Sequence, residues 1–502
     1  MGNLDCHGNF RLIGLRYHST NILQREALAG MAGLDNFDDD EHPPRPNDRS
    51  DDDLRRFREQ LKNGEKDINN TEALEEIIQF YFEHSQFDEA LHFVDRLLSF
   101  EPFNSDAWQR KGMILNNLYR YDEALTCYDK ALQLNPTDPE AFVNKGITLD
   151  NLNRVEEALR SFNAALELEP LYEDALFHKG VTLEKQEKFE EAVAIFRLML
   201  DMNQEHPDAW YELGYCYDFL EKLEESAKCY DEHLNRDPYN FNAWYNRGIV
   251  LNRLGQFTKS IESYEMALAI KEDFPSAWYN KGNAYANLGR LYDAIDCFKM
   301  TLKFEPGDVP GWHNLGNAYE ELGLYKEAIG AFTNALKYDE NHYESFFGRG
   351  SCYDALEQPK KALIEYKKAI SINPDYSELW HAKADAEYNL ARIEESLASY
   401  RMVLKLDPSN AEAWFDYGDT LYETGEITES TEALGECVKL APNFAPALYT
   451  LAKIHILLHE HKAAVESLSI AFSQEPQLMK QFKKDYPDLK SHRDFAPLLK
   501  KQ

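Results

Sequence analysis

A period of 34 residues constrains the fold of this chain more than any other feature of its sequence. All seven tryptophans occupy one position of a repeating unit, at Trp108, Trp210, Trp244, Trp278, Trp312, Trp380 and Trp414. Cutting the chain every 34 residues from Thr71 gives twelve repeats that end at Leu478, without insertion or deletion. A constant period of this length predicts a stack of similar units that bury a continuous core between neighbours.

The residue sizes within one repeat predict a helical hairpin. With tryptophan as position 4, position 8 is glycine in nine repeats, position 20 is alanine or serine, and position 24 is mostly Phe or Tyr. At 100° per residue, positions 4, 8 and 11 share one stripe of a first helix, and positions 20, 24 and 27 share one stripe of a second. Small residues at 8 and 20 let the two helices approach closely, while the large rings fill the space beside them.

Start and stop signals agree with these hairpins. In the stretch NPTDPEAF, Asp138 is placed to cap a first helix, Pro139 suits its first turn, and Pro136 prevents the preceding helix from continuing. Gly289 is placed to end another first helix. The sequence therefore predicts an all-α chain of short, antiparallel helices.

The repeats resemble the tetratricopeptide repeat family, and AWYNKGNAYANLGRLYDAIDCFKMTLKFEP, from Ala277, is close to that family's consensus. The resemblance implies an α-solenoid, a right-handed superhelix of helix-turn-helix repeats whose first helices line a concave groove that holds other proteins. Ile78, Ala384 and Ala452 depart from the pattern by replacing the glycine at position 8. Leu74 and Leu448, in the first and last repeats, replace the ring at position 4, as expected for terminal units.

The segments around the repeats differ in composition. We expect an acidic, disordered tail at 1–52, a capping helix at 53–70, twelve repeats at 71–478 and a basic capping segment at 479–502. The capping segment would pack Phe482, Tyr486 and Leu489 on the last repeat; alternatively, it competes for the acidic groove. The opening MGNLDC matches lipidation motifs only in part, because Cys6 stands where myristoylation requires Ser or Thr.

Charge and cysteine usage limit the partners and the location. The 88 acidic and 54 basic residues give a formal charge of −34, which repels nucleic acid and anionic lipid. No run approaches the ~18 apolar residues of a membrane helix. Seven cysteines without a CxxC pair suit a reducing compartment. We therefore expect a cytoplasmic protein that binds neither nucleic acid nor membranes.

Asparagines and rings recur on the stripe that would face the groove. The predicted peptide-binding residues are asparagines at positions 6 and 9 (Asn144, Asn246, Asn280, Asn314, Asn283 and Asn317) and rings at position 5 (Tyr211, Tyr245, Tyr279 and His313). Regularly spaced amides suit the backbone of an extended peptide. The asparagines resemble the peptide-gripping ladder in the repeats of O-linked N-acetylglucosamine transferases, although no transferase domain follows. Alternatively, both sets only fill the inner surface of the solenoid.

Acidic residues at position 12 suggest a basic ligand. They lie near the C-terminal ends of the first helices, where the helix dipole disfavours negative charge, so a role in binding is attractive. Asp218 and Glu320 are the predicted contacts, and Asp150, Glu184 and Asp354 share their position.

Catalysis finds no support in the sequence. The chain has no Gly-rich phosphate loop, no HExxH and no GxSxG, and HILLHEH (His455, His459 and His461) lacks a third metal ligand on the same face. We expect no cofactor and no metal. The leading hypothesis is a non-catalytic scaffold or adaptor that binds an extended, basic peptide centred on repeats 6 to 8. The alternative is a self-associating structural scaffold.

Overall fold

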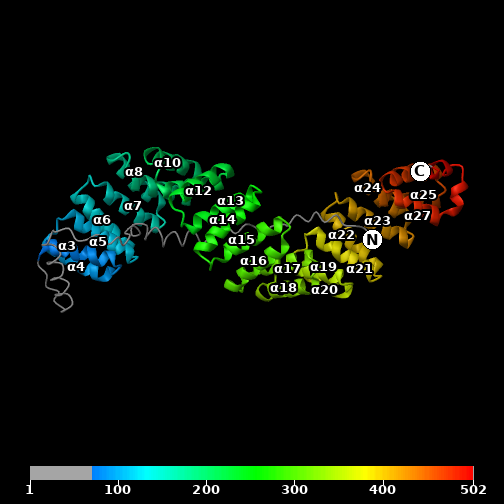
Figure 1. Cartoon of the computed structure of the whole chain (residues 1–502), viewed down its shortest axis with the longest axis horizontal. Helices are drawn as coiled ribbons and strands as arrows, with labels where there is room; N and C mark the ends of the chain where they lie inside the picture. The colour runs from blue at the N-terminus through cyan, green and yellow to red at the C-terminus, as the bar shows by residue number, and fades with distance from the viewer. Residues whose placement is uncertain (1–69, 501–502) are drawn as a thin grey trace. The chain divides into compact units, whose positions relative to one another are not determined.

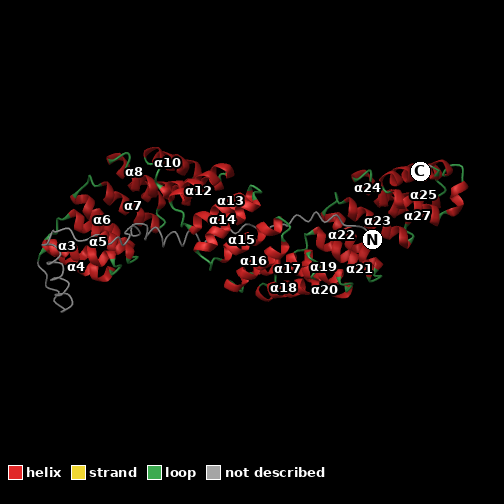
Figure 2. Cartoon of the chain, in the orientation of Figure 1, coloured by secondary structure: helices red, strands yellow, loops and turns green. Residues whose placement is uncertain are grey.

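The computed structural model describes residues 70–500, and every regular element among them is a helix (Figures 1 and 2). The predicted tail at 1–52, the capping helix at 53–70 and the MGNLDC motif lie outside the described residues. The chain divides between Glu272 and Asp273 into two compact units. We call residues 70–272 the first unit and residues 273–500 the second unit.

The first unit consists of six helical hairpins. Its helices are α3 (Thr71–Glu83), α4 (Phe87–Phe100), α5 (Ser105–Asn117), α6 (Tyr121–Leu134), α7 (Pro139–Asn151), α8 (Val155–Leu168), α9 (Glu173–Lys185), α10 (Phe189–Met202), α11 (Pro207–Phe219), α12 (Leu223–Arg236), α13 (Phe241–Arg253) and α14 (Phe257–Ile270). Odd-numbered helices are the first helices of their hairpins.

The second unit continues the pattern with six more hairpins and a C-terminal segment. Its helices are α15 (Pro275–Asn287), α16 (Leu291–Phe304), α17 (Val309–Glu321), α18 (Tyr325–Tyr338), α19 (Tyr343–Ala355), α20 (Pro359–Ile372), α21 (Ser377–Asn389), α22 (Ile393–Leu406), α23 (Ala411–Thr424), α24 (Ile427–Leu440), α25 (Ala445–Leu457), α26 (His461–Gln474), α27 (Pro476–Asp485), the 3₁₀ helix η1 (Pro487–Ser491) and α28 (Ala496–Leu499). The prediction of an all-α chain built from helical hairpins is confirmed for the described residues.

The glycine at position 8 makes room for the ring at position 24. A Cβ atom added at Gly146 would lie 2.5 Å from the ring of Phe162, and one added at Gly316 would lie 2.5 Å from the ring of Phe332. Three of the serines at position 20 donate a hydrogen bond from the hydroxyl to the carbonyl of the glycine at position 8: Ser226 to Gly214 at 2.7 Å, Ser260 to Gly248 at 2.8 Å and Ser430 to Gly418 at 2.7 Å. The close approach predicted from residue size is therefore the core of each hairpin.

The tryptophans at position 4 connect each hairpin to the turn before it. The Trp244 indole donates a hydrogen bond to the carbonyl oxygen of Pro238 at 2.9 Å. The same bond joins Trp312 to Pro306 at 2.9 Å. Indole supplies both apolar area and an N–H donor, which explains why this position favours tryptophan over other rings.

The predicted helix ends are confirmed where the sequence signals were strongest. Asp138 caps α7 by accepting hydrogen bonds from the backbone N–H groups of Glu140 and Ala141 at 3.0 and 3.3 Å, and Pro139 begins the helix. Gly289 follows α15 with a φ of 70°, a left-handed conformation that glycine adopts without a Cβ clash.

The C-terminal segment packs on the last hairpin through aromatic residues. Phe482 of α27 and Phe495 are fully buried in a cluster that includes Phe472 of α26. Tyr486 and Leu489 are partly buried against the same cluster. Among residues 70–500, no helix combines the length and apolar character needed to span a bilayer.

Candidate functional site

The first helices of neighbouring hairpins contact one another within each unit, as α5 and α7 do in the first and α17 and α19 in the second. Side chains at positions 5, 6, 9, 12 and 13 of these helices meet between neighbours. We call this surface the first-helix face and describe it separately for each unit. It holds every candidate residue that the sequence singled out.

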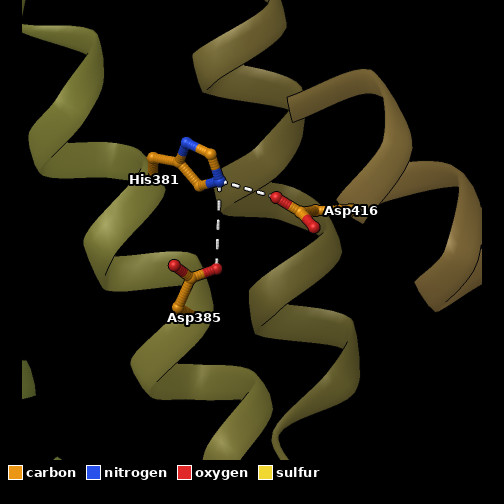
Figure 3. Close-up of side chains that lie close together, drawn as sticks. All are labelled: His381, Asp385 and Asp416. Atoms are coloured by element: carbon orange, nitrogen blue, oxygen red, sulfur yellow. Dashed lines mark hydrogen bonds and ion pairs between the residues drawn. The ribbon is translucent and has the colours of Figure 1, made fainter. Parts of the chain in front are cut away.

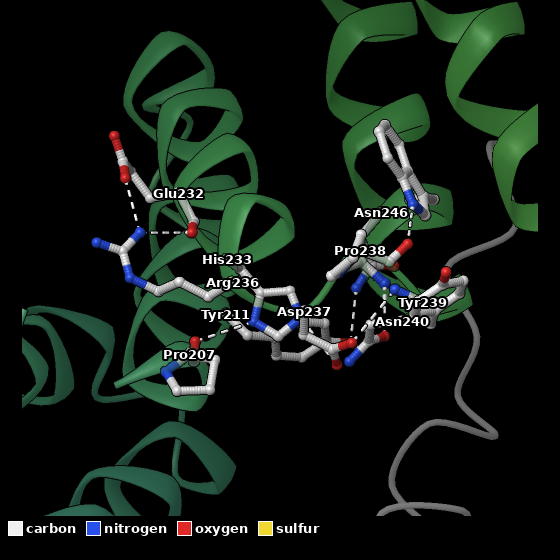
Figure 4. Close-up of polar contacts among 12 residues, drawn as sticks. Pro207, Tyr211, Glu232, His233, Arg236, Asp237, Pro238, Tyr239, Asn240 and Asn246 are labelled. Carbon is white, nitrogen blue, oxygen red and sulfur yellow. Dashed lines mark hydrogen bonds and ion pairs between the residues drawn. The ribbon is translucent and has the colours of Figure 1, made fainter. Parts of the chain in front are cut away.

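Two of the asparagines at position 6, Asn246 and Asn314, bond to the tyrosine at position 5 of the preceding repeat. In the first unit, the Asn246 side-chain amide donates to the Tyr211 hydroxyl at 2.9 Å (Figure 4). In the second unit, the Asn314 amide donates to the Tyr279 hydroxyl at 3.0 Å and to Asn283 Oδ1 at 2.9 Å. These amides therefore link neighbouring hairpins, which is a structural use that the regular spacing did not reveal.

The remaining ladder residues are divided between the two units. Asn144 is half-buried in the first unit, and Asn280 is buried in the second. Asn317 Nδ2 lies 3.1 Å from His313 Nε2, and His313 Nδ1 lies 3.2 Å from the Ser345 hydroxyl. Burial, reinforced by the charge of His342, lowers the pKa of His313 to about 3, so this imidazole is neutral.

The rings at position 5 pack against the rings at position 24 of their own hairpins. The ring centroids lie 5.7 Å apart for Tyr211 and Tyr230, 6.0 Å for Tyr245 and Tyr264, 6.0 Å for Tyr279 and Phe298, and 5.5 Å for His313 and Phe332. Such pairs stabilise each hairpin. That the same rings also contact a ligand stays a prediction.

Two of the three acids at position 12 of the first unit have cationic partners, which differs from the expectation that they await a basic ligand, whereas the third, Glu184, lies 3.9 Å from the Cys216 thiol. Asp218 forms an ion pair with Arg253, which also contacts Glu221. Asp150 forms an ion pair with Lys185 at 2.8 Å. Each cation stands at position 13 of the following repeat, 35 residues after its acid, where adjacent first helices bring the two side chains together.

The second unit presents acids with a different environment. The pKa values of Glu320, Asp354, Asp385 and Asp419 are all raised, chiefly because burial disfavours the charged form. Each carboxyl accepts a hydrogen bond from a neutral hydroxyl group: Glu320 from Ser351, Asp354 from Tyr366 at 2.7 Å, Asp385 from Tyr400 at 2.6 Å, and Asp419 from Thr450 at 2.8 Å. Within residues 70–500, none of the four forms an ion pair with lysine or arginine.

One charged cluster on this face escaped the sequence analysis. His381 Nε2 lies 2.8 Å from Asp416 Oδ2 and 4.0 Å from Asp385 Oδ1 (Figure 3). The signal was present, because His381 and Asp385 are one helical turn apart and Asp416 follows His381 by 35 residues. In the HILLHEH stretch, His455 and His459 do not lie one turn apart on a single helix. Helix α25 ends at Leu457, and His459 lies in the following turn with a φ of 61°.

Family models match the chain over most of its repeats. Models described as tetratricopeptide repeat match residues 105–138, 143–205, 207–240, 275–308, 309–342, 343–376 and 411–444. A further model described as TPR repeat matches residues 250–289 and 384–425. Together these matches cover more than half of the chain.

Several solved structures are similar to parts of the chain. YrrB, described as a TPR protein with an unusual peptide-binding site, is 23% identical, covers 38% of this chain and 97% of its own, and has a TM-score of 0.34. The C-terminal part of a TPR repeat-containing protein from Cytophaga hutchinsonii is 21% identical, with coverage of 47% and 97% and a TM-score of 0.42. The APC/C hetero-tetramer Cut9-Hcn1 is 13% identical, with coverage of 86% and 96% and a TM-score of 0.39. The chain matches none of the curated proteins with which it was compared.

Proposed function

Because this chain belongs to the tetratricopeptide repeat family, whose members mediate protein–protein interactions, we propose that it is a non-catalytic scaffold that binds an extended, basic segment of a partner protein. The binding surface is the first-helix face of the second unit. We thus propose that peptide binding is centred on repeats 8 to 11, whereas the sequence predicted repeats 6 to 8.

The observation that carries this proposal is the row of four carboxyls on successive first helices, Glu320 on α17, Asp354 on α19, Asp385 on α21 and Asp419 on α23. Burial disfavours their charged forms, which raises their pKa values, and none of the four has a lysine or arginine ion-pair partner within residues 70–500. A lysine or arginine side chain of a ligand would supply that partner and lower the pKa of each carboxyl. The formal charge of −34 would attract a basic segment from a distance.

The spacing along the chain suits an extended ligand. Glu320 and Asp354 stand at position 12 of their repeats, and Asp385 and Asp419 stand at position 9, so a peptide that crosses these four first helices meets one of these carboxyls on each. The buried amides and rings between these helices supply a rigid support. Rigid presentation of charge lowers the entropic cost of binding.

The test is a titration of extended lysine-rich and arginine-rich peptides, with acidic peptides of equal length for comparison. The double variant Asp354→Asn with Asp419→Asn removes two of the four charges while keeping the side-chain shape. We expect it to bind basic peptides about 30-fold more weakly, since two lost charge pairs at about 1 kcal/mol each amount to about 2 kcal/mol. Raising the salt concentration should weaken binding to the unchanged protein.

The matched control changes the same number of charges on second helices of the second unit. Glu394→Gln with Glu429→Gln alters exposed residues of the second helices α22 and α24. Its affinity should equal that of the unchanged protein. Equal weakening by both double variants would show that only net charge matters, and would reject the first-helix face as the binding surface.

Three further expectations belong to the same proposal. Within residues 70–500, six of the seven cysteines (Cys127, Cys216, Cys229, Cys297, Cys352 and Cys437) are buried and outside any disulfide, which supports a reducing compartment such as the cytoplasm. The net negative charge argues against nucleic acid as a partner. Self-association stays a prediction, which light scattering at two protein concentrations tests.

A further inference from the structure

Three repeat positions meet wherever two first helices are adjacent: positions 5 and 9 of one helix and position 6 of the next. Between α15 and α17 the three residues are Tyr279, Asn283 and Asn314, and the Asn314 amide donates to the other two. Between α21 and α23 the same three positions hold His381, Asp385 and Asp416. The three positions thus hold neutral side chains between α15 and α17, but one imidazole and two carboxylates between α21 and α23.

The second set brings three metal-ligating groups together. One ligand atom from each of His381, Asp385 and Asp416 lies within 4.8 Å of the other two (Figure 3). Zinc binds such atoms at about 2.0–2.2 Å in a tetrahedral arrangement, which places the ligand atoms about 3.4 Å apart. The distances of 2.8 and 4.0 Å from His381 Nε2 to the two carboxylates lie on either side of that value. Small side-chain rotations would therefore complete the site.

The surroundings favour a cation and hold one ligand in place. The Tyr400 hydroxyl donates to Asp385 Oδ1 at 2.6 Å, as outer hydrogen-bond partners do for metal-binding carboxylates. Burial lowers the pKa of His381, but the hydrogen bond to Asp416 and the charges of Asp385, Asp416 and Glu412 outweigh it, so the pKa is raised. In the metal-free protein a proton on the imidazole therefore partly compensates the two carboxylates.

We propose that His381, Asp385 and Asp416 bind one divalent transition metal ion, with zinc preferred, between α21 and α23. Imidazole nitrogen with carboxylate oxygens is a donor set that suits Zn²⁺ better than Mg²⁺ or Ca²⁺. The ion replaces the imidazole proton and joins hairpins 10 and 11, and water completes its coordination. This inference goes beyond the proposed function, because its ligand is inorganic and its residues differ from those altered in the peptide test.

The experiment is calorimetric titration of the full chain with Zn²⁺ alone, after removal of metal with a chelator and with the cysteines kept reduced. We expect one ion per chain. His381→Gln and Asp416→Asn, each nearly isosteric, should weaken binding about 100-fold, and Tyr400→Phe about tenfold, in line with losses at other metal sites. Circular dichroism without metal checks that each variant folds.

Two controls make the result decisive. His455→Gln alters a histidine that pairs with Glu460 at 2.8 Å, outside the cluster, and should leave zinc affinity unchanged. Co²⁺ should give visible absorption bands at one equivalent, and these bands should vanish in Asp416→Asn.

The outcomes separate a metal site from a structural ion pair. Zinc binding that is unchanged in His381→Gln and Asp416→Asn, or that is lost equally in His455→Gln, would overturn the proposal. The pair His381–Asp416 would then be a link between hairpins only. Asp385 also belongs to the row of carboxyls proposed to bind peptide, so the peptide titrations with the Asp354 and Asp419 variants are made on zinc-free protein, which keeps the two results distinguishable.

Discussion

The two units treat the carboxyl groups of their first helices differently, although their backbones repeat the same hairpin. In the first unit, Asp150 and Asp218 are paired with Lys185 and Arg253 of the following repeats. In the second unit, position 13 holds no basic residue: it is occupied by Asn287, Glu321, Ala355, Asn389, Glu423 and Leu457. Asp150 and Asp218 are therefore neutralised within the first unit, whereas the second unit has no basic residue at the position that would pair with Glu320 or Asp354.

The comparison shows how a repeat protein can vary its chemistry without changing its fold. Residues at positions 3, 8, 20 and 24 pack within and between hairpins and are similar throughout. Positions 5, 6, 9, 12 and 13 meet across neighbouring first helices, where a neutral amide, an ion pair or a His–Asp cluster all fit. Four predictions test this difference, from the largest expected effect to the smallest.

The largest effect should come from removing a core ring in one unit only. Phe332 is fully buried against the space left by Gly316 and Gly348, so Phe332→Ala should destabilise the second unit by about 4 kcal/mol. Phe162→Ala is the matched change in the first unit. Hydrogen exchange with mass spectrometry should locate each loss in the altered unit. Equal loss of protection in both units would show that they unfold as one, and would contradict the division.

Removing a cation should expose the charge that the first unit neutralises. The side chain of Asp218 is 7% exposed, and Arg253→Ala leaves it without its arginine. We expect a loss of about 3 kcal/mol in unfolding free energy, as for other buried pairs that lose one partner. The control Arg154→Ala breaks an exposed pair with Glu157 and should cost less than about 1 kcal/mol in urea denaturation. Equal losses of unfolding free energy in Arg253→Ala and Arg154→Ala would mean that the ion pairs between first helices stabilise the fold no more than exposed pairs do.

Adding a cation should give the second unit the chemistry of the first. Asn389 is exposed, ends α21, and follows Asp354 by 35 residues, so Asn389→Arg reproduces the relation of Arg253 to Asp218. We expect a gain of about 0.5–1 kcal/mol in stability from the new pair and from the helix C-terminus. Binding of basic peptides should weaken at the same time, whereas Asn389→Gln should change neither. A more stable variant with undiminished peptide affinity would separate stability from binding.

The smallest effect concerns pH. Burial raises the pKa of the Asp354 carboxyl above the usual 3.8 of an aspartate, so the folded state binds this proton more tightly than the unfolded state does. The contribution of Asp354 to the free energy of unfolding therefore increases as the pH falls. Asp354→Asn should therefore be more stable than the unchanged protein at pH 7.5, by less than about 0.5 kcal/mol, and the difference should shrink as the pH falls toward 3.8. His313, whose pKa is lowered to about 3, acts in the opposite direction, which is why the variant is compared with the unchanged protein at each pH.

Features that lie within one repeat could be predicted from the sequence. The glycine at position 8, the aromatic residue at position 24 and the cap at Asp138 each act on neighbours in the same hairpin or turn. Their spacing alone places them on one stripe of a helix or at its end. The residues that line the first-helix face were also identified correctly as residues of the first helices.

Contacts between side chains of neighbouring repeats could not be predicted, because aligning the repeats compares each position only with the same position in other repeats. The contacts that matter join unlike positions: position 12 with position 13 of the next repeat, and position 5 with position 6. The aligned repeats therefore did not reveal the ion pair between Asp218 and Arg253. For the same reason, His381 was grouped with the rings at position 5 and not with Asp385 and Asp416.

The sequence by itself determined the hairpin, its repetition and its family, since 34-residue spacing and local size patterns act through backbone geometry and short-range packing. Only the tertiary structure decided which side chains of adjacent helices meet, because that depends on the rotation and offset between hairpins. A shift of one helical position changes the partner of every side chain on a face. The same period therefore accommodates acid–base ion pairs in the first unit. In the second unit it accommodates carboxyls that accept hydrogen bonds from hydroxyl groups, together with a His–Asp–Asp cluster.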